Sequence, residues 1–175
     1  MKSIKISILS LGFFCLVATS CGVSEVNNDL TAWKNTNDSY FTNMKDSTAY
    51  TLYTIPASSG GGSYYYKITT PGVQSSISPV VGDQVVVNYR GKMVNGAVFD
   101  QTYSKTVIDS TATPRTFYDN QIIPGWTANL LQMKVGETRS IVLPQELAYG
   151  SVGAGSAISP YSTTIWVVQL IKVIH

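Results

Sequence analysis

The sequence predicts an antiparallel α+β domain preceded by an N-terminal helical extension. Three observations favour this fold class. About five short segments have the alternation or apolar character of strands and are bounded by Pro, Gly and Asn. The dipeptide Asn95-Gly96 is the strongest hairpin signal in the chain. Only one short helical run, at 126–133, lies among these segments.

Length and composition indicate one folded domain with an appendage. The chain has 175 residues, of which 44% are apolar and 13% charged, and it contains eleven tyrosines. Without Lys2 and Lys5, which lie in an N-terminal targeting segment, ten of the twelve basic residues remain against ten acidic residues. A neutral chain without a basic run gives no electrostatic reason to expect nucleic-acid binding.

Residues 1–21 read as a secretion signal. Lys2 and Lys5 precede a short apolar core, 6–17, that is too short to span a bilayer. Ala18-Thr19-Ser20-Cys21 follows and resembles the lipobox of bacterial lipoproteins, although Ala18 stands where Leu is usual. We therefore expect lipid attachment at Cys21. The alternative is ordinary signal cleavage, in which Cys21 has no role.

The cysteine count favours the lipid-anchored alternative. Cys15 would leave with the signal, and Cys21 alone cannot form an internal disulfide. The expected location is the envelope of a Gram-negative bacterium, with the protein anchored to a membrane, in the first place the outer membrane, facing the periplasm or the surface.

Residues 22–63 are expected to form an extension outside the main domain, which we place at 64–175. A polar tether, 22–28, precedes an amphipathic helix, 29–46. This helix could pack on the domain or serve as a partner-binding or dimerising arm. Residues 50–55 could add an edge strand, and the Ser/Gly-rich segment 58–63 reads as a flexible joint or a long turn. The apolar face of the helix comprises Leu30, Trp33, Tyr40, Phe41 and Met44.

The main domain is expected to consist of strands with one helix. The strand at 84–90 places Val85, Val87 and Tyr89 on one face. Residues 138–143 alternate as a half-buried strand does, whereas 164–174 is apolar on both faces, as in a covered central strand. The other strand segments are 64–68, 98–100 and 116–117, with a long polar insertion at 101–114.

The stretch 121–150 predicts an apolar pocket with few polar groups. Ile122 and Ile123 precede a break at Pro124-Gly125, and the helical run 126–133 then places Trp126, Leu130 and Met133 on one face. Tyr149 lies in a Gly-bounded loop. An indole at the start of a short helix and one aromatic hydroxyl suit such a pocket.

The composition argues against several kinds of chemistry. His175 is the only histidine, so the usual nitrogen and sulfur ligands of zinc and the base of a Ser-His or Cys-His pair are missing. The glycines at 150–155 do not follow the dinucleotide-binding pattern, and there is no phosphate-binding loop lysine. We therefore expect a reaction that needs no metal, no cofactor and no covalent intermediate.

Three groups of motifs resemble the FKBP-type peptidyl-prolyl cis-trans isomerases. IIPGW, LxxMxVGE and LPxELAYG occur in order within 121–150, VVVNYRGKMVNGAVFD lies upstream at 85–100, and AISPYSTTIWVVQLIKV lies downstream at 157–173. The resemblance covers 64–175. It implies a twisted half-barrel sheet wrapped around the Trp126 helix, and isomerisation of X-Pro bonds in exported proteins as an aid to folding in the envelope.

The resemblance also implies a role for each site residue. Trp126 would form the floor of the pocket, and the N–H of Ile123 and the hydroxyl of Tyr149 would bind substrate carbonyls. Asp100 would accept a hydrogen bond from Tyr89 and present a dipole to the twisting carbonyl. The remaining substrate-binding residues would be Phe99, Phe117, Gln121, Ile122, Ile158 and Trp166.

Three departures from the family pattern qualify the resemblance. Trp166 replaces the usual Phe, Ser159 replaces the first Pro of a Pro-Pro pair, and the insertion 101–114 leaves only Lys105 as a candidate for the family's basic residue. The expected partners are proline-containing polypeptides, and a macrolide is a further candidate ligand. The alternative function is a non-catalytic or weakly catalytic proline-binding or chaperone lipoprotein.

Overall fold

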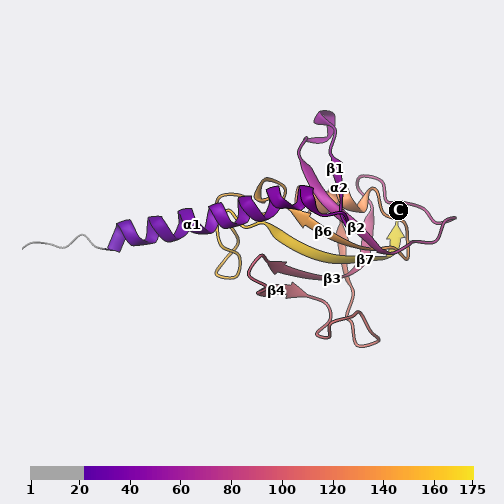
Figure 1. The fold of residues 1–175 in the computed structure, drawn as a ribbon. Coiled ribbons are helices and arrows are strands. Elements are labelled where there is room, and N and C mark those ends of the chain that lie inside the picture. Colours follow the sequence, from indigo (N-terminus) through magenta and orange to yellow (C-terminus); the bar gives the residue numbers. More distant parts are fainter. Residues whose placement is uncertain (1–21) are drawn as a thin grey trace, which may run out of the picture.

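The computed structural model describes residues 22–175, which form one antiparallel sheet with helices on both of its faces (Figure 1). The targeting segment and the lipid site expected at Cys21 lie outside the described residues. The helices are α1 (Gly22–Asn43) and α2 (Pro124–Leu130), with short 3-10 turns η1 (Met44–Asp46), η2 (Ala57–Ser59) and η3 (Gln145–Leu147). The strands are β1 (Thr51–Thr54), β2 (Ser63–Thr70), β3 (Gln84–Met93), β4 (Val98–Gln101), β5 (Arg115–Tyr118), β6 (Thr138–Leu143) and β7 (Thr164–Ile174).

The strand order in the sheet is β1-β2-β6-β7-β3-β4, and β5 also pairs with β3. All of these pairings are antiparallel, which confirms the predicted α+β class. The described residues form seven strands instead of about five, and β1 and β5, of four residues each, correspond to the strand segments predicted at 50–55 and 116–117. β4 pairs with β3 at 90–92 and β5 pairs with it at 84–87, so two strands share one edge of β3.

The main core lies between the sheet and α2. It comprises inward-facing residues of β3, β6 and β7 together with Trp126, Leu130 and Met133, as predicted for the helical run. The predicted break at Pro124-Gly125 is wrong, because Pro124 opens the helix. Proline is tolerated in the first turn, where its missing N–H would have no intrahelical acceptor. The helix ends at Leu130, before Met133, which is nevertheless fully buried.

A second, smaller core covers the opposite face of the sheet. Tyr65, Val142 and Ile165, from β2, β6 and β7, pack there against Phe41 in the last turn of α1 and against Met44 and Tyr50, which follow the helix. The rings of Phe41 and Tyr65 meet edge to face with centroids 5.2 Å apart. Every residue of β6 is therefore buried, and the prediction that 138–143 is half-buried is wrong. The cause lies in a distant segment, 41–50, which covers the outer face.

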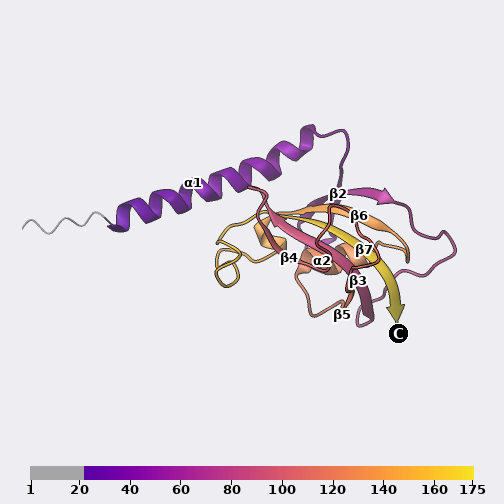
Figure 2. The same ribbon diagram turned by 90° about the horizontal axis from the view of Figure 1, so that it is seen from below.

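α1 is longer than predicted and packs on the domain through its C-terminal half. Residues 22–28, expected to be a tether, belong to the helix, since after Gly22 this polar stretch contains no Gly or Pro that would interrupt it. The N-terminal part of the helix projects away from the sheet (Figure 2). Trp33 donates an indole hydrogen bond to Ser162 at 3.2 Å, and the Asn37 side chain accepts one from the backbone N–H of Thr163 at 2.8 Å.

Replacement of Asn37 by Ala is expected to lower the free energy of unfolding by about 1–3 kcal/mol, the usual cost of a buried polar group left unpaired. The Asn37 side chain is fully buried, and its removal leaves the N–H of Thr163 without a hydrogen-bond acceptor. Urea denaturation measures the change, and the exposed neighbour Asn35→Ala serves as control. Equal stability of the two variants would contradict this account of how α1 is held.

Residues 58–63 form a turn within one hairpin. They connect β1 to β2, and Gly60, Gly61 and Gly62 adopt positive φ angles of 100°, 70° and 96°, which glycine adopts without strain. The N–H of Ile55 donates to the carbonyl of Gly62 at 2.9 Å. β1 is thus the expected edge strand. No helix within residues 22–175 combines the length and apolar character needed to cross a bilayer.

Candidate active site

A cavity of about 370 Å³ opens between the sheet and the N-terminal end of α2. It falls in the size range of ligand-binding pockets. The structure brings nine of the eleven predicted site residues into its lining: Tyr89, Asp100, Phe117, Gln121, Ile122, Ile123, Trp126, Tyr149 and Trp166. Phe99 is not among the lining residues but contacts two of them: its ring meets that of Trp166 edge to face at 4.9 Å and that of Tyr149 at 6.2 Å. Ile158 is buried in the loop before β7, paired with Ala154.

Trp126 lies at the centre of an aromatic cluster that lines the pocket. Its ring centroid is 5.1 Å from that of Tyr89, 5.0 Å from Trp166 and 6.1 Å from Phe117, and all three pairs meet nearly edge to face. This geometry is the favoured one for aromatic pairs. β3, β5 and β7 each supply one ring, so the walls are fixed by the sheet and the floor by α2.

Gly91 permits the close approach of two of these rings. A Cβ atom at this position would overlap the Trp166 ring and lie 2.7 Å from ring atoms of Phe99. We expect Gly91→Ala to destabilise the protein by about 1–3 kcal/mol, as overpacking does. The near-ultraviolet circular dichroism of the aromatic cluster should change as well. Gly96→Ala is a less suitable control because of its positive φ, so exposed Ala97→Ser is used. Unchanged stability in Gly91→Ala would contradict the packing described.

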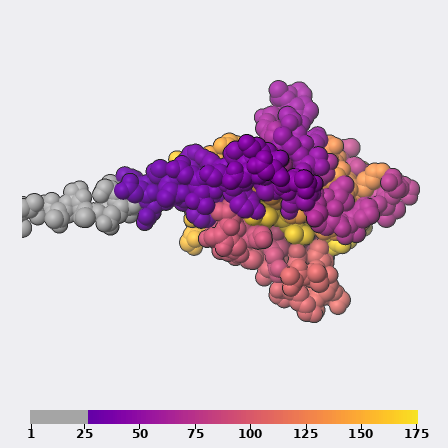
Figure 3. Space-filling model, viewed as in Figure 1, coloured from indigo at the N-terminus to yellow at the C-terminus, as the bar shows by residue number. Residues whose placement is uncertain are grey.

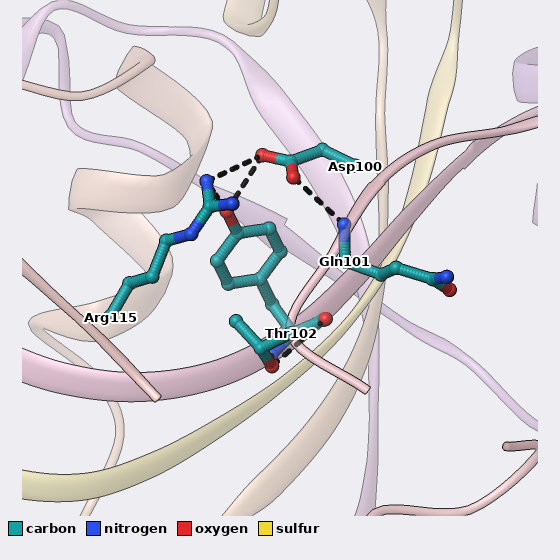
Figure 4. A network of polar contacts seen from close by, with 5 residues as sticks. Asp100, Gln101, Thr102 and Arg115 are labelled. Atoms are coloured by element: carbon teal, nitrogen blue, oxygen red, sulfur yellow. Dashed lines mark hydrogen bonds and ion pairs between the residues drawn. The ribbon is translucent and has the colours of Figure 1, made fainter. Parts of the chain in front are cut away.

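A polar network borders the aromatic cluster. The Tyr89 hydroxyl donates to Asp100 Oδ2 at 2.6 Å and accepts from Arg115 Nη1 at 2.8 Å. The same guanidinium lies 3.4 Å from Asp100 Oδ2 (Figure 4). The second carboxylate oxygen of Asp100 accepts the backbone N–H of Gln101 at 2.8 Å. The carboxylate is thereby oriented by a hydroxyl, a cation and a backbone amide.

The shared edge of β3 explains how this network forms. Asp100 lies on β4 opposite Gly91, and Arg115 opens β5 opposite Val87, so the two flank Tyr89. Below them, Thr102 accepts the backbone N–H of Tyr89 at 2.9 Å and is buried (Figure 4). These bonds hold the start of the insertion 101–114 against β3.

Sequence reasoning missed Arg115. Lys105, the candidate named for the basic residue, instead pairs with Asp109 at 2.7 Å. Arg115 immediately precedes the predicted strand at 116–117, and its position before Phe117 was the available signal. Periodicity could not show that this strand pairs with β3 beside Tyr89.

Two tyrosine hydroxyls of the pocket are held in their neutral form. Burial, the hydrogen bond to Asp100 and the charge of Asp100 raise the pKa of Tyr89, and Arg115 only partly opposes them. Burial and the charge of Asp100 also raise the pKa of Tyr149. Both hydroxyls therefore remain hydrogen-bond donors throughout the physiological pH range.

Ile123 provides a backbone donor at the pocket. It is the residue preceding α2, with φ −59° and ψ 143°, and its carbonyl accepts the N–H of Trp126 at 2.9 Å. Among residues 22–175 its own N–H has no hydrogen-bond acceptor. Over the same residues, no group of three or more His, Cys, Asp and Glu side chains is placed to hold a metal ion.

The structure thus has an apolar pocket between an antiparallel sheet and a short helix, which is the arrangement that the resemblance to the FKBP-type isomerases implied. Residues 75–171 match the family model described as FKBP-type peptidyl-prolyl cis-trans isomerase. The chain belongs to this family.

Curated relatives and solved structures agree with this assignment. The chain is 40% identical over 96 residues to the FKBP-type 22 kDa peptidyl-prolyl cis-trans isomerase of Escherichia coli, a segment covering 55% of this chain and 44% of that protein. It is 39% identical over 108 residues to the peptidyl-prolyl cis-trans isomerase Mip of Coxiella burnetii, covering 62% of this chain and 44% of Mip. The chain thus spans less than half the length of these relatives.

The fold is similar to that of FkpA from Escherichia coli, with a TM-score of 0.70 and 28% identity over 87% of this chain and 64% of FkpA. A peptidyl-prolyl cis-trans isomerase from Pseudomonas syringae pv. tomato gives a TM-score of 0.67 and 26% identity, over 83% of this chain and 96% of that one. Both alignments extend beyond the segment 75–171 that matches the family model.

Proposed function

We propose that this protein catalyses cis-trans isomerisation of X-Pro bonds in polypeptides. The observation that carries the proposal is the aromatic pocket of about 370 Å³, bordered by Asp100 and by the neutral donors Tyr89 and Tyr149. These groups suit a reaction in which no bond is broken except the partial double bond of the amide.

Rotation about the X-Pro amide bond can be accelerated by moving the amide from water into an apolar pocket. The planar amide is stabilised by resonance, and the barrier to rotation is about 18–20 kcal/mol. Because the planar form is more charge-separated than the twisted form, water stabilises the planar ground state. An apolar pocket removes that stabilisation, and fixed dipoles favour the twisted form. A thousandfold acceleration needs only about 4 kcal/mol.

Each pocket residue has a role in the proposal. The prolyl ring would rest on Trp126 between the aromatic walls. The N–H of Ile123 and the hydroxyl of Tyr149 would each bind a substrate carbonyl. Asp100, oriented by Tyr89 and Arg115, would present its dipole to the carbonyl that rotates.

The test is the rate of cis-to-trans isomerisation of a Leu-Pro peptide, measured with purified protein. We expect acceleration, which falls in Tyr149→Phe while the melting temperature is retained. A well-folded protein that binds the peptide without accelerating the reaction would instead establish the alternative, a proline-binding or chaperone lipoprotein. Competition with a macrolide tests whether such a ligand enters past Trp166.

The envelope location and the lipid anchor at Cys21 are part of the proposal. One relative with this type of domain is named outer membrane protein MIP, from Legionella longbeachae. Mass spectrometry of the protein extracted from membranes should show a diacylglyceryl thioether on Cys21, and Cys21→Ser should leave the protein unanchored. An unmodified Cys21 in the mature chain would exclude the anchor.

We also propose that residues 64–175 form the catalytic domain and that 22–63 serves exported clients. Deletion of 22–63 should then reduce the protection of an aggregating client more than the turnover of short peptides. Because β1 and the Asn37 contacts would be lost, the melting temperature of the deletion variant must be measured alongside.

Turnover of a short, uncharged Leu-Pro peptide is expected to vary by less than about twofold between pH 6 and 9. The pKa values of Tyr89 and Tyr149 are raised above the ordinary value for tyrosine, about 10. Both hydroxyls therefore stay protonated throughout this interval. Activity should fall only where the hydroxyls ionise, at still higher pH. A bell-shaped profile centred between pH 6 and 9 would contradict the assigned donors.

A further inference from the structure

A groove of about 630 Å³ lies on the far side of segment 120–124 from the active-site pocket. One wall is β1 with the turn that follows it, which protrudes from the body of the molecule (Figures 1 and 3). Thr127 and Ala128 of α2 also line the groove, as does Val81. We call this feature the hairpin groove. Its lining consists of Tyr53, Ile55, Pro56, Ser58, Ser59, Val81, Asn120, Ile122, Pro124, Thr127, Ala128, Leu131 and Gln132.

The hairpin groove adjoins the active-site pocket at one shared residue. Ile122 lines both cavities. On either side of it the segment alternates, since Gln121 and Ile123 line the pocket whereas Asn120 and Pro124 line the groove. A polypeptide seated in the pocket can therefore continue across Ile122 into the groove.

The chemistry of the groove selects the kind of segment that fits. None of the thirteen lining residues is charged, in a protein that carries twelve basic and ten acidic residues overall. Apolar side chains such as Ile55 and Leu131 predominate. The amides of Asn120 and Gln132 can each donate and accept hydrogen bonds, as a peptide backbone requires. An uncharged polypeptide matches this surface, whereas a charged segment would lose hydration without gaining a partner.

We propose that the hairpin groove binds uncharged residues that flank the X-Pro bond of a client, so that groove and pocket form one extended polypeptide site. The inference rests on the proposed isomerase function and names the substrate class of the same site. Five lining residues, Tyr53 to Ser59, precede the segment 75–171 that matches the family. The N-terminal hairpin thus extends the site beyond the segment that matches the family model.

The experiment compares peptides with the same central Leu-Pro sequence. One is a tetrapeptide, one has four uncharged residues added on each side, and one has Glu and Lys in those flanks. With purified protein, kcat/KM should be about tenfold higher for the long uncharged peptide than for the tetrapeptide, the low end of what one buried group adds in a hydrophobic pocket. The charged long peptide should gain nothing.

The double variant Ser58→Glu/Gln132→Glu places two carboxylates in the groove at exposed positions, outside the pocket lining. It should remove the tenfold advantage and leave tetrapeptide turnover unchanged. Gln74→Glu/Ser75→Glu is the matched control, because it makes the same two changes at exposed positions that line neither cavity.

Binding of the fluorescently labelled long peptide, read by anisotropy, separates this proposal from the isomerase proposal. If the protein turns over no peptide but the groove variant still binds the long peptide about tenfold more weakly than the control variant, the groove stands and the isomerase fails. Equal effects of groove and control variants, or no advantage of the long peptide, would overturn the groove. A dimer that dissociates only in the groove variant, seen by sedimentation, would overturn it also.

Discussion

Arg139→Met is expected to lower the free energy of unfolding by about 3–5 kcal/mol, because it leaves a buried carboxylate without its cation. Glu137, just before β6, and Arg139, the second residue of β6, are both buried and form an ion pair. The guanidinium also donates to the carbonyl of Gln132 at 2.6 Å and lies 4.8 Å from the ring centroid of Tyr66. It therefore fastens the chain after α2 to the sheet.

Urea unfolding measures this loss of stability. Two further variants test whether the unpaired buried carboxylate is its cause. Lys67→Met removes a positive charge from an exposed position on the neighbouring strand β2 and should change stability by less than about 0.5 kcal/mol. Glu137→Leu combined with Arg139→Met should recover much of the loss, since a buried pair replaced by apolar residues is often neutral. A double variant as unstable as Arg139→Met alone would show that the packing of the arginine, and not the stranded charge, stabilises the fold.

Asp100→Ala is expected to lower kcat/KM for a Leu-Pro peptide by about tenfold to a hundredfold, the effect of losing a charged hydrogen-bond partner worth about 1.5–3 kcal/mol. The carboxylate accepts the Tyr89 hydroxyl at 2.6 Å and is one of the pocket lining groups. Its removal frees the Tyr89 hydroxyl and takes away the proposed dipole at the rotating carbonyl.

Two variants make the result specific. Gln101→Ala changes the exposed neighbour, whose side chain bonds Arg90 and not the pocket, and should leave turnover unchanged. Arg115→Met should have an intermediate effect, because it loosens Asp100 and Tyr89 without removing either. Asp100→Ala with full activity and an unchanged melting temperature would remove Asp100 from the mechanism.

Local patterns in the sequence were sufficient for much of the architecture. The alternation at 84–90 identified β3 and placed Tyr89 on the core face, and Asn95-Gly96 gave the hairpin that carries Asp100. The motif resemblance identified the pocket residues, nine of which the structure brings together. These features could be predicted because turn chemistry and side-chain period are properties of adjacent residues.

The sequence-based predictions that proved wrong concern features that depend on contacts between residues far apart in the chain. The helix begins at Gly22, and β6 is covered on both faces by residues near 41–50 that no strand pattern at 138–143 could reveal. Trp166 and Phe99 meet over Gly91, a contact that joins three separate segments.

Most of the strands and the aromatic composition of the pocket could be predicted from local sequence. The pairing of β4 and β5 with one edge of β3, which sets Asp100 and Arg115 on either side of Tyr89, became visible only in the folded structure. The position of Ile122 between the pocket and the hairpin groove also became visible only there. The physical reason is that strand pairing and cavity walls arise from contacts between residues far apart in the chain, which periodicity in a local window does not encode.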